Sequence, residues 1–349
     1  MRHRKKIIVS YSEIISLDNL LLAWKNFSTG KKHKKDVQEF GLHLMDNLIE
    51  LHQSLKEKTY THGPYHAFKV NDPKPRDIHK ARVRDRVVHH LLYQSLAPYF
   101  FRRFIHDSYS CQDRKGVHRA IKRFETFSRQ VSKNHTQQCF VLKCDIRKFF
   151  ASIDQGILLK ILEEWIEDQD VLWLLERIIR SFSLSCHLDR TTSERRDSSV
   201  TLGMTSKRGL PLGNLTSQLL VNIYMNEFDQ FVKHKLKVKY YIRYADDFVI
   251  FSQDKGELET LLIKIQCLLK LRLNLELHPN KVSIETLGKG VDFLGWVHFL
   301  GYRVLRTVTK RRMLKRVNEK NVASYFGTLG WGNGWKLWVT VNQLKDRLK

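Results

Sequence analysis

The chain has 349 residues, of which 42% are hydrophobic and 11% aromatic, enough to build two or three packed units. Lys and Arg number 61 against 36 Asp and Glu, so the formal net charge is +25 and a polyanionic partner is expected. Charged residues interrupt every apolar run well before the roughly 18 residues that a membrane-spanning helix needs. The five cysteines include no C-x-x-C pair. These features argue against an integral membrane protein and favour a soluble, cytoplasmic protein with reduced cysteines.

The first part of the chain predicts a basic, mostly helical unit. One amphipathic helix is expected over residues 36–57, because apolar residues recur there at helical spacing: Phe40, Leu44, Leu48, Leu51 and Leu55. A short extended segment is expected near 65–70. Val83, Val87 and Leu91 predict a second helix, which is flanked by Pro98.

The middle of the chain predicts alternating strands and helices. Residues 139–146 are short, apolar and rich in strand formers, which predicts a buried strand that delivers Asp145 at its end. Helices are expected next at 155–166, 170–182 and 214–234. The polar stretch 187–208, between the last two, is expected to be a loop.

A hairpin is predicted next, because Ala245-Asp-Asp separates two strand-like runs that begin at Tyr240 and Phe248. The remaining expected elements are a helix at 256–271, a short strand pair around 274–284, a hairpin near 291–296 and a separate C-terminal element with a basic segment at 303–316 and a Trp/Gly-rich stretch at 325–338.

Adjacent carboxylates between apolar strands cost folding energy unless a cation neutralises them. Together with Asp145, the pair Asp246 and Asp247 could hold two Mg²⁺ ions about 4 Å apart, which is the charge stabilisation that phosphoryl transfer needs. Asp is also common in ordinary hairpin turns. The metal interpretation gains weight because Tyr244-Ala-Asp-Asp, the 140–150 segment and Gly209-Leu-Pro-Leu-Gly occur in one basic chain in polymerase order.

On these motifs the sequence resembles reverse transcriptases over nearly its whole length. The resemblance implies an α+β right-hand polymerase with fingers over 1–136, an antiparallel-sheet palm over 137–290, and a primer grip and short helical thumb over 291–349. It implies an RNA-directed DNA polymerase that uses dNTPs, an RNA template and two Mg²⁺ ions, which Mn²⁺ could replace.

The resemblance also suggests roles for individual residues. Ile146 would join the three aspartates at the metal site, and Lys281 would protonate the leaving pyrophosphate, although a plain phosphate contact fits equally well. Phe150 would be an aromatic gate that excludes ribonucleotides, unless it is a core aromatic. The residues expected to bind the dNTP are Lys74, Arg76, Arg84, Arg86, Ile146, Phe150, Leu212, Gly213 and Gln218.

The basic finger residues could instead form a solvated helix face or a general nucleic-acid contact. Asp85 is expected to pair with Arg84 or Arg86, His89 and His90 to be packing or polar partners, and Asp154 to be a helix cap or a surface carboxylate. The primer grip would be the hairpin Phe293, Leu294, Gly295 and Trp296. The basic residues expected on the thumb helix are Arg303, Arg306, Lys310, Arg311 and Arg312.

Most reverse transcriptases have glutamine at the position of Leu212. An apolar residue there, in the segment Leu212-Gly-Asn-Leu-Thr-Ser-Gln, resembles the enzymes of diversity-generating retroelements. Such enzymes copy a template repeat RNA with frequent errors at adenines for mutagenic retrohoming. Their implied partners are a structured template RNA, its cDNA and a small, basic, oligomeric accessory protein. Leu212 could also simply pack beside the palm helix.

Two alternatives remain open. One is a defence-associated or retron-like bacterial reverse transcriptase. The other is a non-catalytic RNA-binding scaffold derived from a polymerase, which the presence of all three aspartates and of Phe150 disfavours.

Overall fold

The computed structural model describes residues 6–71, 75–182 and 207–346, and the chain divides into two compact units. Unit 1 comprises Met1–Ile105, Arg147–Phe231 and Leu268–Glu276, and unit 2 comprises His106–Ile146, Val232–Cys267 and Leu277–Lys349. Helices and antiparallel strands occur in both, so the predicted α+β class is confirmed. Because each unit is built from non-consecutive segments, the three consecutive fingers, palm and thumb segments stay a prediction.

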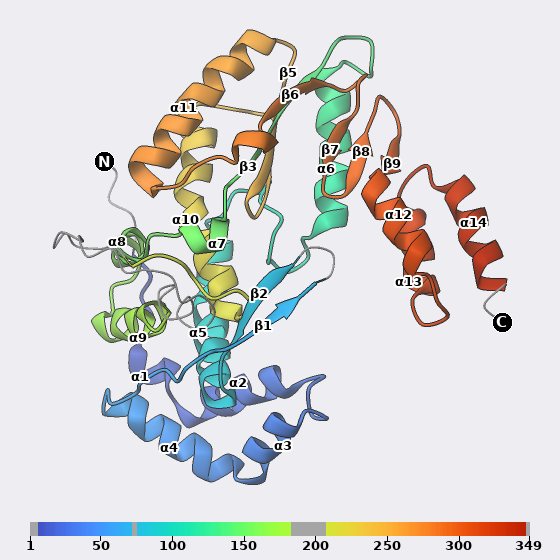
Figure 1. Ribbon diagram of the computed structural model, residues 1–349. Helices are drawn as coiled ribbons and strands as arrows, with labels where there is room; N and C mark the ends of the chain where they lie inside the picture. Colours follow the sequence, from blue (N-terminus) through green and yellow to red (C-terminus); the bar gives the residue numbers. More distant parts are fainter. Residues whose placement is uncertain (1–5, 72–74, 183–206, 347–349) are drawn as a thin grey trace, which may run out of the picture. The chain divides into compact units, whose positions relative to one another are not determined.

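Unit 1 is mainly helical. Its first five helices are α1 (Tyr11–Ile14), α2 (Leu17–Ser28), α3 (Lys35–Leu42), α4 (Leu44–Lys56) and α5 (Val83–Phe101). The chain later adds α7 (Phe149–Ser152), α8 (Gln155–Trp165), α9 (Gln169–Arg180) and α10 (Leu215–Gln230). Helix α5 is central, because both α2 and α10 pack against it (Figure 1). None of the described helices combines the length and apolar character needed to cross a membrane.

The helix predicted over 36–57 is in fact two helices. His43 has φ −116° and ψ 42°, outside the helical region, and separates α3 from α4. The predicted apolar stripe is fully buried only in α4, at Leu48, Leu51 and Leu55. The second predicted helix is confirmed as α5, although it continues through Pro98, where the missing N–H costs only one hydrogen bond in the last turn.

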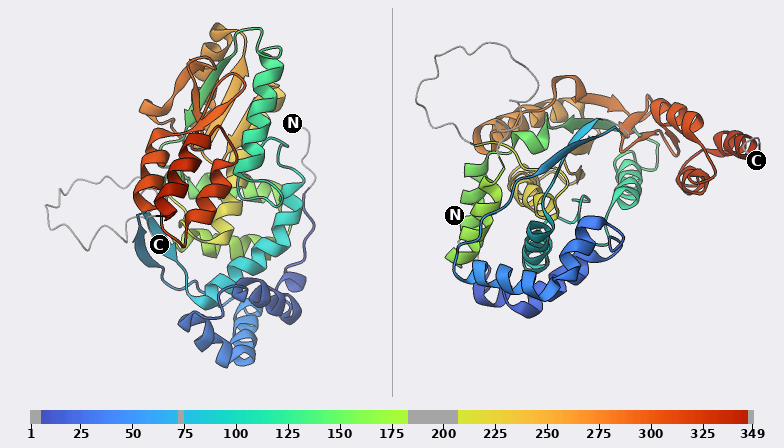
Figure 2. Two further views of the ribbon diagram at one scale, coloured as in Figure 1. Left: turned by 90° about the vertical axis from the view of Figure 1, so that its right-hand side faces the viewer. Right: turned by 60° about the horizontal axis from the view of Figure 1, so that its bottom comes forward.

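A two-stranded antiparallel ribbon lies in unit 1, formed by β1 (His66–Val70) and β2 (Arg76–Lys80) with Phe68 opposite Ile78. It confirms the extended segment expected near 65–70. Every residue of β1 is exposed, whereas on β2 His79 is buried and Lys80 pairs with Asp36 of α3; Figure 2 shows the ribbon in blue. Because an isolated two-stranded hairpin is only marginally stable in water, β2 needs support on its other edge. Most of the loop predicted at 187–208 lies outside the described residues.

Unit 2 is built on a four-stranded antiparallel sheet of order β4-β5-β3-β6, from β3 (Phe140–Asp145), β4 (Tyr241–Tyr244), β5 (Asp247–Ser252) and β6 (Ser283–Thr286). Helix α6 (Val117–Val131) packs on β4 and β5, and α11 (Lys255–Leu273) runs along the opposite face (Figure 1). The predicted strand pair around 274–284 is a single strand, β6. Before it, a 3₁₀ turn spans Pro279–Lys281, and Leu277 makes only an isolated bridge to Ile146.

The rest of unit 2 is a three-stranded sheet and three helices: β7 (Val291–Phe293), β8 (Trp296–His298), β9 (Arg303–Leu305), α12 (Thr307–Arg316), α13 (Val322–Leu329) and α14 (Trp335–Asp346). The C-terminal helices are not a separate element, because Trp296 and Leu305 share a buried core with Met313, Leu329 and Val341. A Cβ added to Gly332 would lie 2.2 Å from the Trp296 ring.

Gly332→Ala should therefore lower the free energy of unfolding by roughly 1–3 kcal/mol, the usual cost of overpacking. Denaturant titration followed by tryptophan fluorescence measures the change. Gly327→Ala is the matched control, because no atom lies within 4 Å of its added Cβ and alanine favours the helix α13. Equal stability of the two variants would contradict the tight Gly332 contact.

Candidate active site

The three predicted catalytic aspartates lie at one end of the four-stranded sheet of unit 2. Asp145 ends β3 and pairs directly with Asp247, the first residue of β5. Asp246 lies in the preceding turn with Ala245, whose φ is 54°. The backbone N–H of Ile146 donates to the carbonyl oxygen of Asp246 at 3.2 Å. Because directly opposed residues share a face of the sheet, the carboxylates of Asp145 and Asp247 lie on the same side.

The charged form of the Asp247 carboxylate is unfavourable at this position. Its Oδ1 is buried and has no hydrogen-bond partner. The pKa of the Asp247 carboxyl is raised to about 7, chiefly by burial; the nearby carboxylates of Asp145, Asp246 and Asp292 contribute to the rise, and Lys143 opposes it. The sheet end therefore holds more negative charge than its own cations offset.

Lys281 lies beside the first aspartate. Its Nζ is 2.8 Å from Asp145 Oδ1, and the backbone N–H of His278 donates to the Asp145 carbonyl at 2.7 Å. The 3₁₀ turn Pro279–Lys281 thus delivers the lysine to the end of β3. The structure brings together Lys281 and Asp145, two residues that were predicted to act at one site.

The carboxylates of Asp145, Asp246 and Asp247 are the candidate ligands for a divalent cation at this site. Within 6–71, 75–182 and 207–346, no three His, Cys, Asp or Glu side chains converge closely enough to form a ready metal cluster, so the predicted three-aspartate ligand set is not assembled. The chemistry of the donors nevertheless suits a hard cation, because carboxylate oxygens are available and Asp247 Oδ1 lacks a partner. Asp145, Asp246 and Asp247 are the residues that would hold it.

A buried arginine supports the turn that carries Asp246. Arg243 on β4 is fully buried, and its guanidinium donates to the Ala245 carbonyl at 3.0 Å and to Ser108 Oγ at 3.1 Å. Sequence analysis missed this residue, although a charged residue within the strand run that starts at Tyr240 was a signal. Arg243 holds the carbonyl of the one turn residue that has a left-handed backbone.

The residues predicted to contact the nucleotide base and sugar lie in unit 1. Phe150, in α7, is half-buried and therefore not a fully enclosed core residue. Its carbonyl accepts from the N–H of Leu210 at 2.8 Å, and the carbonyl of Leu212 accepts from the N–H of His79 at 2.9 Å. Leu212 and Gln218 are half-buried and Gly213 is exposed. The segment that carries Leu212 is thus tied to the residue predicted to be the aromatic gate.

The basic residues of the predicted fingers have differing surroundings. Arg76 on β2 is exposed, and Lys74 lies outside the described residues. Arg86 pairs with Asp36 at 2.5 Å, and Lys80 pairs with the same carboxylate at 2.7 Å. Lys80 is a partner that sequence analysis did not identify.

Arg84 is also engaged within unit 1. It lies 5.0 Å from the Tyr60 ring centroid and donates to Ser54 Oγ at 3.0 Å. The prediction that Asp85 pairs with Arg84 or Arg86 is wrong. Asp85 is buried and accepts from the Tyr60 hydroxyl at 2.8 Å and from the Gly63 N–H at 3.1 Å, because consecutive helix residues do not face each other.

Two smaller predictions are confirmed. Asp154 caps α8 by accepting from the N–H groups of Gly156 and Ile157. His89 is a polar partner, because it is buried and its Nδ1 lies 2.6 Å from Thr216 Oγ1. The cysteines among the described residues, Cys111, Cys139, Cys144 and Cys267, are free thiols.

The predicted primer grip is the hairpin between β7 and β8. Leu294 and Gly295 form its tip with φ values of 50° and 86°. The side chains of Phe293 and Trp296 are buried in two different cores, and the half-buried Leu294 packs against both, so the tip backbone is what the hairpin can present to a nucleic acid.

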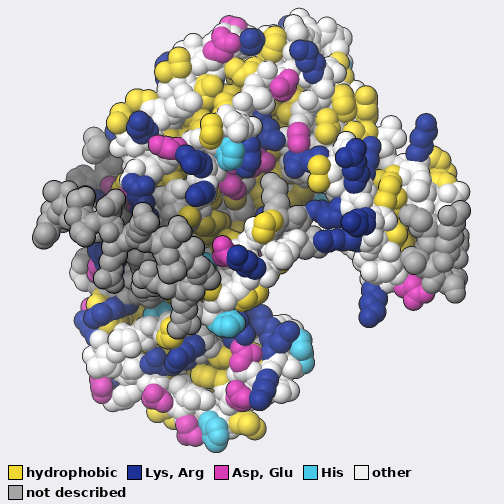
Figure 3. Space-filling view, viewed as in Figure 1, with side chains coloured by type: hydrophobic (Ala, Val, Ile, Leu, Met, Phe, Trp, Pro, Cys, Tyr) yellow, Lys and Arg dark blue, Asp and Glu magenta, His cyan; other side chains and the backbone are white. Residues whose placement is uncertain are grey.

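The basic residues beyond this hairpin only partly follow the expectation of a thumb helix. Arg303 lies in β9 and pairs with Glu125 at 3.3 Å, and Arg306 precedes α12 and pairs with Asp292. On α12, Lys310 is half-buried and Arg311 is exposed. Lys and Arg side chains gather over the α12 region, in dark blue at the right of Figure 3.

Comparison with known proteins identifies the class to which this site belongs. Residues 69–298 match the family model for the reverse transcriptase (RNA-dependent DNA polymerase) domain, and this match covers more than half of the chain. The chain therefore belongs to the reverse transcriptase family. Its helices and antiparallel sheet are consistent with a right-hand polymerase fold.

Two curated relatives support this membership. Protein YkfC of Escherichia coli is 26% identical over 255 residues, which are 64% of this chain and 62% of that protein. The putative COX1/OXI3 intron 2 protein of Saccharomyces cerevisiae is 22% identical over 220 residues, which are 47% of this chain and 24% of that protein. The chain thus spans less than two thirds of either relative.

Solved structures of telomerase are also similar to this chain. Telomerase from Candida albicans, in complex with a TWJ fragment of telomeric RNA, has a TM-score of 0.46 and 12% identity over 71% of this chain and 46% of its own. Apo telomerase from Candida tropicalis, truncated from the C-terminal domain, has a TM-score of 0.45 and 12% identity over 75% and 59%.

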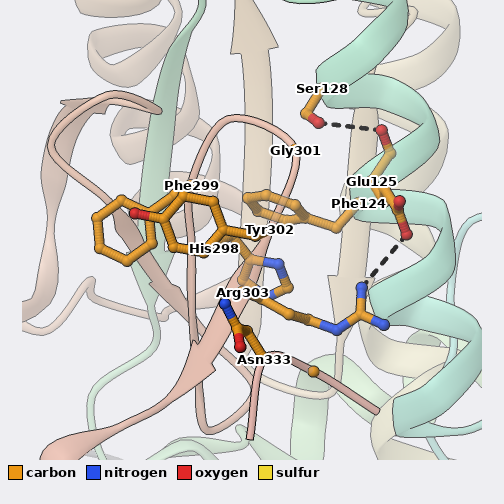
Figure 4. A pocket seen from close by; sticks show the side chains of 10 residues that line it. Phe124, Glu125, Ser128, His298, Phe299, Gly301, Tyr302, Arg303 and Asn333 are labelled. Carbon is orange, nitrogen blue, oxygen red and sulfur yellow. Dashed lines mark hydrogen bonds and ion pairs between the residues drawn. The ribbon is translucent and has the colours of Figure 1, made fainter. Parts of the chain in front are cut away.

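A separate cavity of about 220 Å³ lies between α6 and the β8–β9 hairpin (Figure 4). His298 lines it, and its ring stacks on Phe124 with centroids 4.1 Å apart. The pKa of His298 is lowered to about 4, chiefly by burial; a bond to the Phe293 carbonyl opposes the shift and the Arg303 charge contributes to it. His298 is therefore neutral in the folded protein at pH 7.

The stability of the wild type should fall as the pH drops from about 6.5 to about 4, because the unfolded chain protonates His298 in this range and the folded chain does not. The His298 contribution is about 3 kcal/mol across the range. His298→Phe should remove this part of the pH dependence, since a phenyl ring can still stack on Phe124. Denaturant titrations at several pH values measure it; identical pH profiles of the two proteins would contradict the prediction.

Proposed function

We propose that this chain copies RNA into DNA, with Asp145, Asp246 and Asp247 holding two divalent metal ions. The observation that carries the proposal is that Asp145 and Asp247 lie directly opposite each other on neighbouring antiparallel strands, next to the turn with Asp246. All three residues lie inside the region that matches the family. Mg²⁺ suits these oxygen ligands best, and Mn²⁺ would also fit them. Bound ions supply charge stabilisation at the transferred phosphoryl group and activate the primer hydroxyl.

The protein's own groups would bind and orient the substrates. The ammonium group of Lys281, close to Asp145, can donate a proton to the leaving pyrophosphate or contact a phosphate. Ile146, which follows Asp145, is proposed to complete the metal and dNTP site. In unit 1, the half-buried ring of Phe150 would contact the sugar and exclude ribonucleotides. Arg76, exposed on β2, would bind a phosphate bidentately.

Within the family, we assign the chain to the diversity-generating retroelement type. The support is the segment Leu212-Gly-Asn-Leu-Thr-Ser-Gln, in which position 212 is apolar. The Leu212 side chain can make no hydrogen bond, so a mismatched base pair loses less there than it would beside a polar group. The product would be cDNA with frequent errors at template adenines.

The proposed partners follow from charge and from the same resemblance. A net charge of +25 suits a structured template RNA, because binding to nucleic-acid phosphates is dominated by Lys and Arg. A small, basic, oligomeric accessory protein is the second proposed partner.

A defence-associated or retron-like reverse transcriptase is the alternative, since it would use the same aspartates. A template and variable repeat pair beside the coding sequence would distinguish the two. A non-catalytic scaffold is disfavoured by the intact aspartates.

Asp246→Asn should abolish primer extension on an RNA template and leave RNA affinity within about twofold, because this change leaves the Lys and Arg contacts with the phosphates intact. Extension assays and RNA-binding titrations measure the two effects. Asp113→Asn, an exposed carboxylate in the same unit, is the control and should extend primers like the wild type. Retained extension by the Asp246 variant would reject the proposed role of this carboxylate.

Leu212→Gln should lower misincorporation, most at template adenines, without abolishing synthesis. A loss of discrimination of about 1.4 kcal/mol corresponds to a tenfold rise in error, so restoring a polar contact should reduce errors by up to about that factor. Sequencing cDNA from both proteins on one template tests this. Equal adenine error rates would remove Leu212 from the explanation of fidelity while leaving the polymerase proposal intact.

A further inference from the structure

The segment that carries Leu212 is joined to strand β2 of the two-stranded ribbon by a pair of hydrogen bonds. The N–H of His79 in β2 donates to the Leu212 carbonyl at 2.9 Å. The side-chain amide of Asn214 donates to the His79 carbonyl at 2.8 Å. Both backbone groups of His79 thus bond the segment, and the Asn214 amide takes the place that a backbone N–H has in a β-ladder.

Close packing reinforces these bonds. Gly213 lies between the two bonded residues with φ +108°, and a Cβ there would be 2.7 Å from the Ile78 Cγ2 methyl. Only glycine allows both this backbone conformation and this approach. Residues 212–214 therefore form the supporting edge of β2, while β1 on the opposite edge is entirely exposed.

The orientation of Asn214 points to a role other than the usual one. It occupies the N-cap position of α10, where an asparagine side chain normally accepts from an N–H of the first turn, yet it makes no cap hydrogen bond. Asn214 is buried, and its Oδ1 has no partner. Because a carbonyl can only accept, the Nδ2 group must be the one that faces His79. The side chain thus serves the contact with β2 and leaves α10 uncapped.

We propose that Asn214 is a positioning residue that fixes Leu212 and Gly213 against β2 and thereby sets how tightly the incoming nucleotide is held. The inference rests on the proposed function, since it concerns nucleotide binding by the same segment. Asn214, which bonds to His79, lies two residues after Leu212. Leu210, which bonds to Phe150, lies two residues before Leu212. Loss of the Asn214 bond releases one of these two ends.

Asn214→Asp separates this role from helix capping. Aspartate is as good an N-cap as asparagine, so a residue that served only α10 would tolerate the change. It cannot donate to the His79 carbonyl, and it places a carboxylate oxygen against that carbonyl. We expect the KM for dNTP to rise about tenfold with kcat within about threefold of the wild type, and the buried carboxylate should also lower the melting temperature.

Asn47→Asp is the matched control, because the Asn47 amide also donates to a backbone carbonyl of unit 1, that of Phe40, at 3.0 Å. This variant should keep the wild-type KM. A wild-type KM in Asn214→Asp, or a lower melting temperature with an unchanged KM, would overturn the positioning role.

Hydrogen exchange gives a readout that needs no activity. The amides of β2, above all that of His79, should exchange at least about tenfold faster in Asn214→Asp than in the wild type, and Asn47→Asp should leave them unchanged. If the wild type makes no cDNA but these amides respond, the proposed function fails and the contact with β2 stands. If the amides do not respond in a protein that makes cDNA, the positioning role fails and the polymerase stands.

Discussion

Two carboxylates, those of Asp145 and Asp247, face each other across one rung of an antiparallel sheet, and like charges so placed repel. Neighbouring cationic residues partly offset this repulsion. Lys281 pairs with Asp145, and Lys143 stabilises the charged form of Asp247. Arg243 holds the adjoining turn through its backbone. What remains is an end of the sheet with surplus negative charge, which costs stability in the protein alone and favours a divalent cation.

Strands, turns and helix caps that depend only on neighbouring residues were predicted correctly. The strand that ends at Asp145 and the hairpin around Asp246 follow from short apolar runs and a turn, and both exist as expected. Asp154 caps a helix because capping involves only the next few residues. The break at His43 and the burial of Asp85 were not predicted, because the pattern around His43 is uniformly helical and the Asp85 partner, Tyr60, lies on another element.

The contacts that organise the candidate site were largely beyond sequence analysis. Asn214 bonds His79, and Arg243 bonds Ser108, each across 135 positions in the chain. No spacing rule connects residues so far apart, and only the fold brings them together. The order of the three aspartates was readable from motifs. The direct pairing of Asp145 with Asp247 across the sheet, and the contact that the predicted Lys281 makes with Asp145, were not.

The core around Trp296 affects how the protein can be divided. The stretch that matches the family ends at residue 298, whereas Trp296 packs with Leu305, Met313 and Val341, which lie beyond that point. A fragment cut at 298 would expose this apolar surface to water, and exposed patches of this kind promote aggregation. The boundary of sequence similarity is therefore not a boundary of folding, and a soluble excised domain would have to include the C-terminal helices.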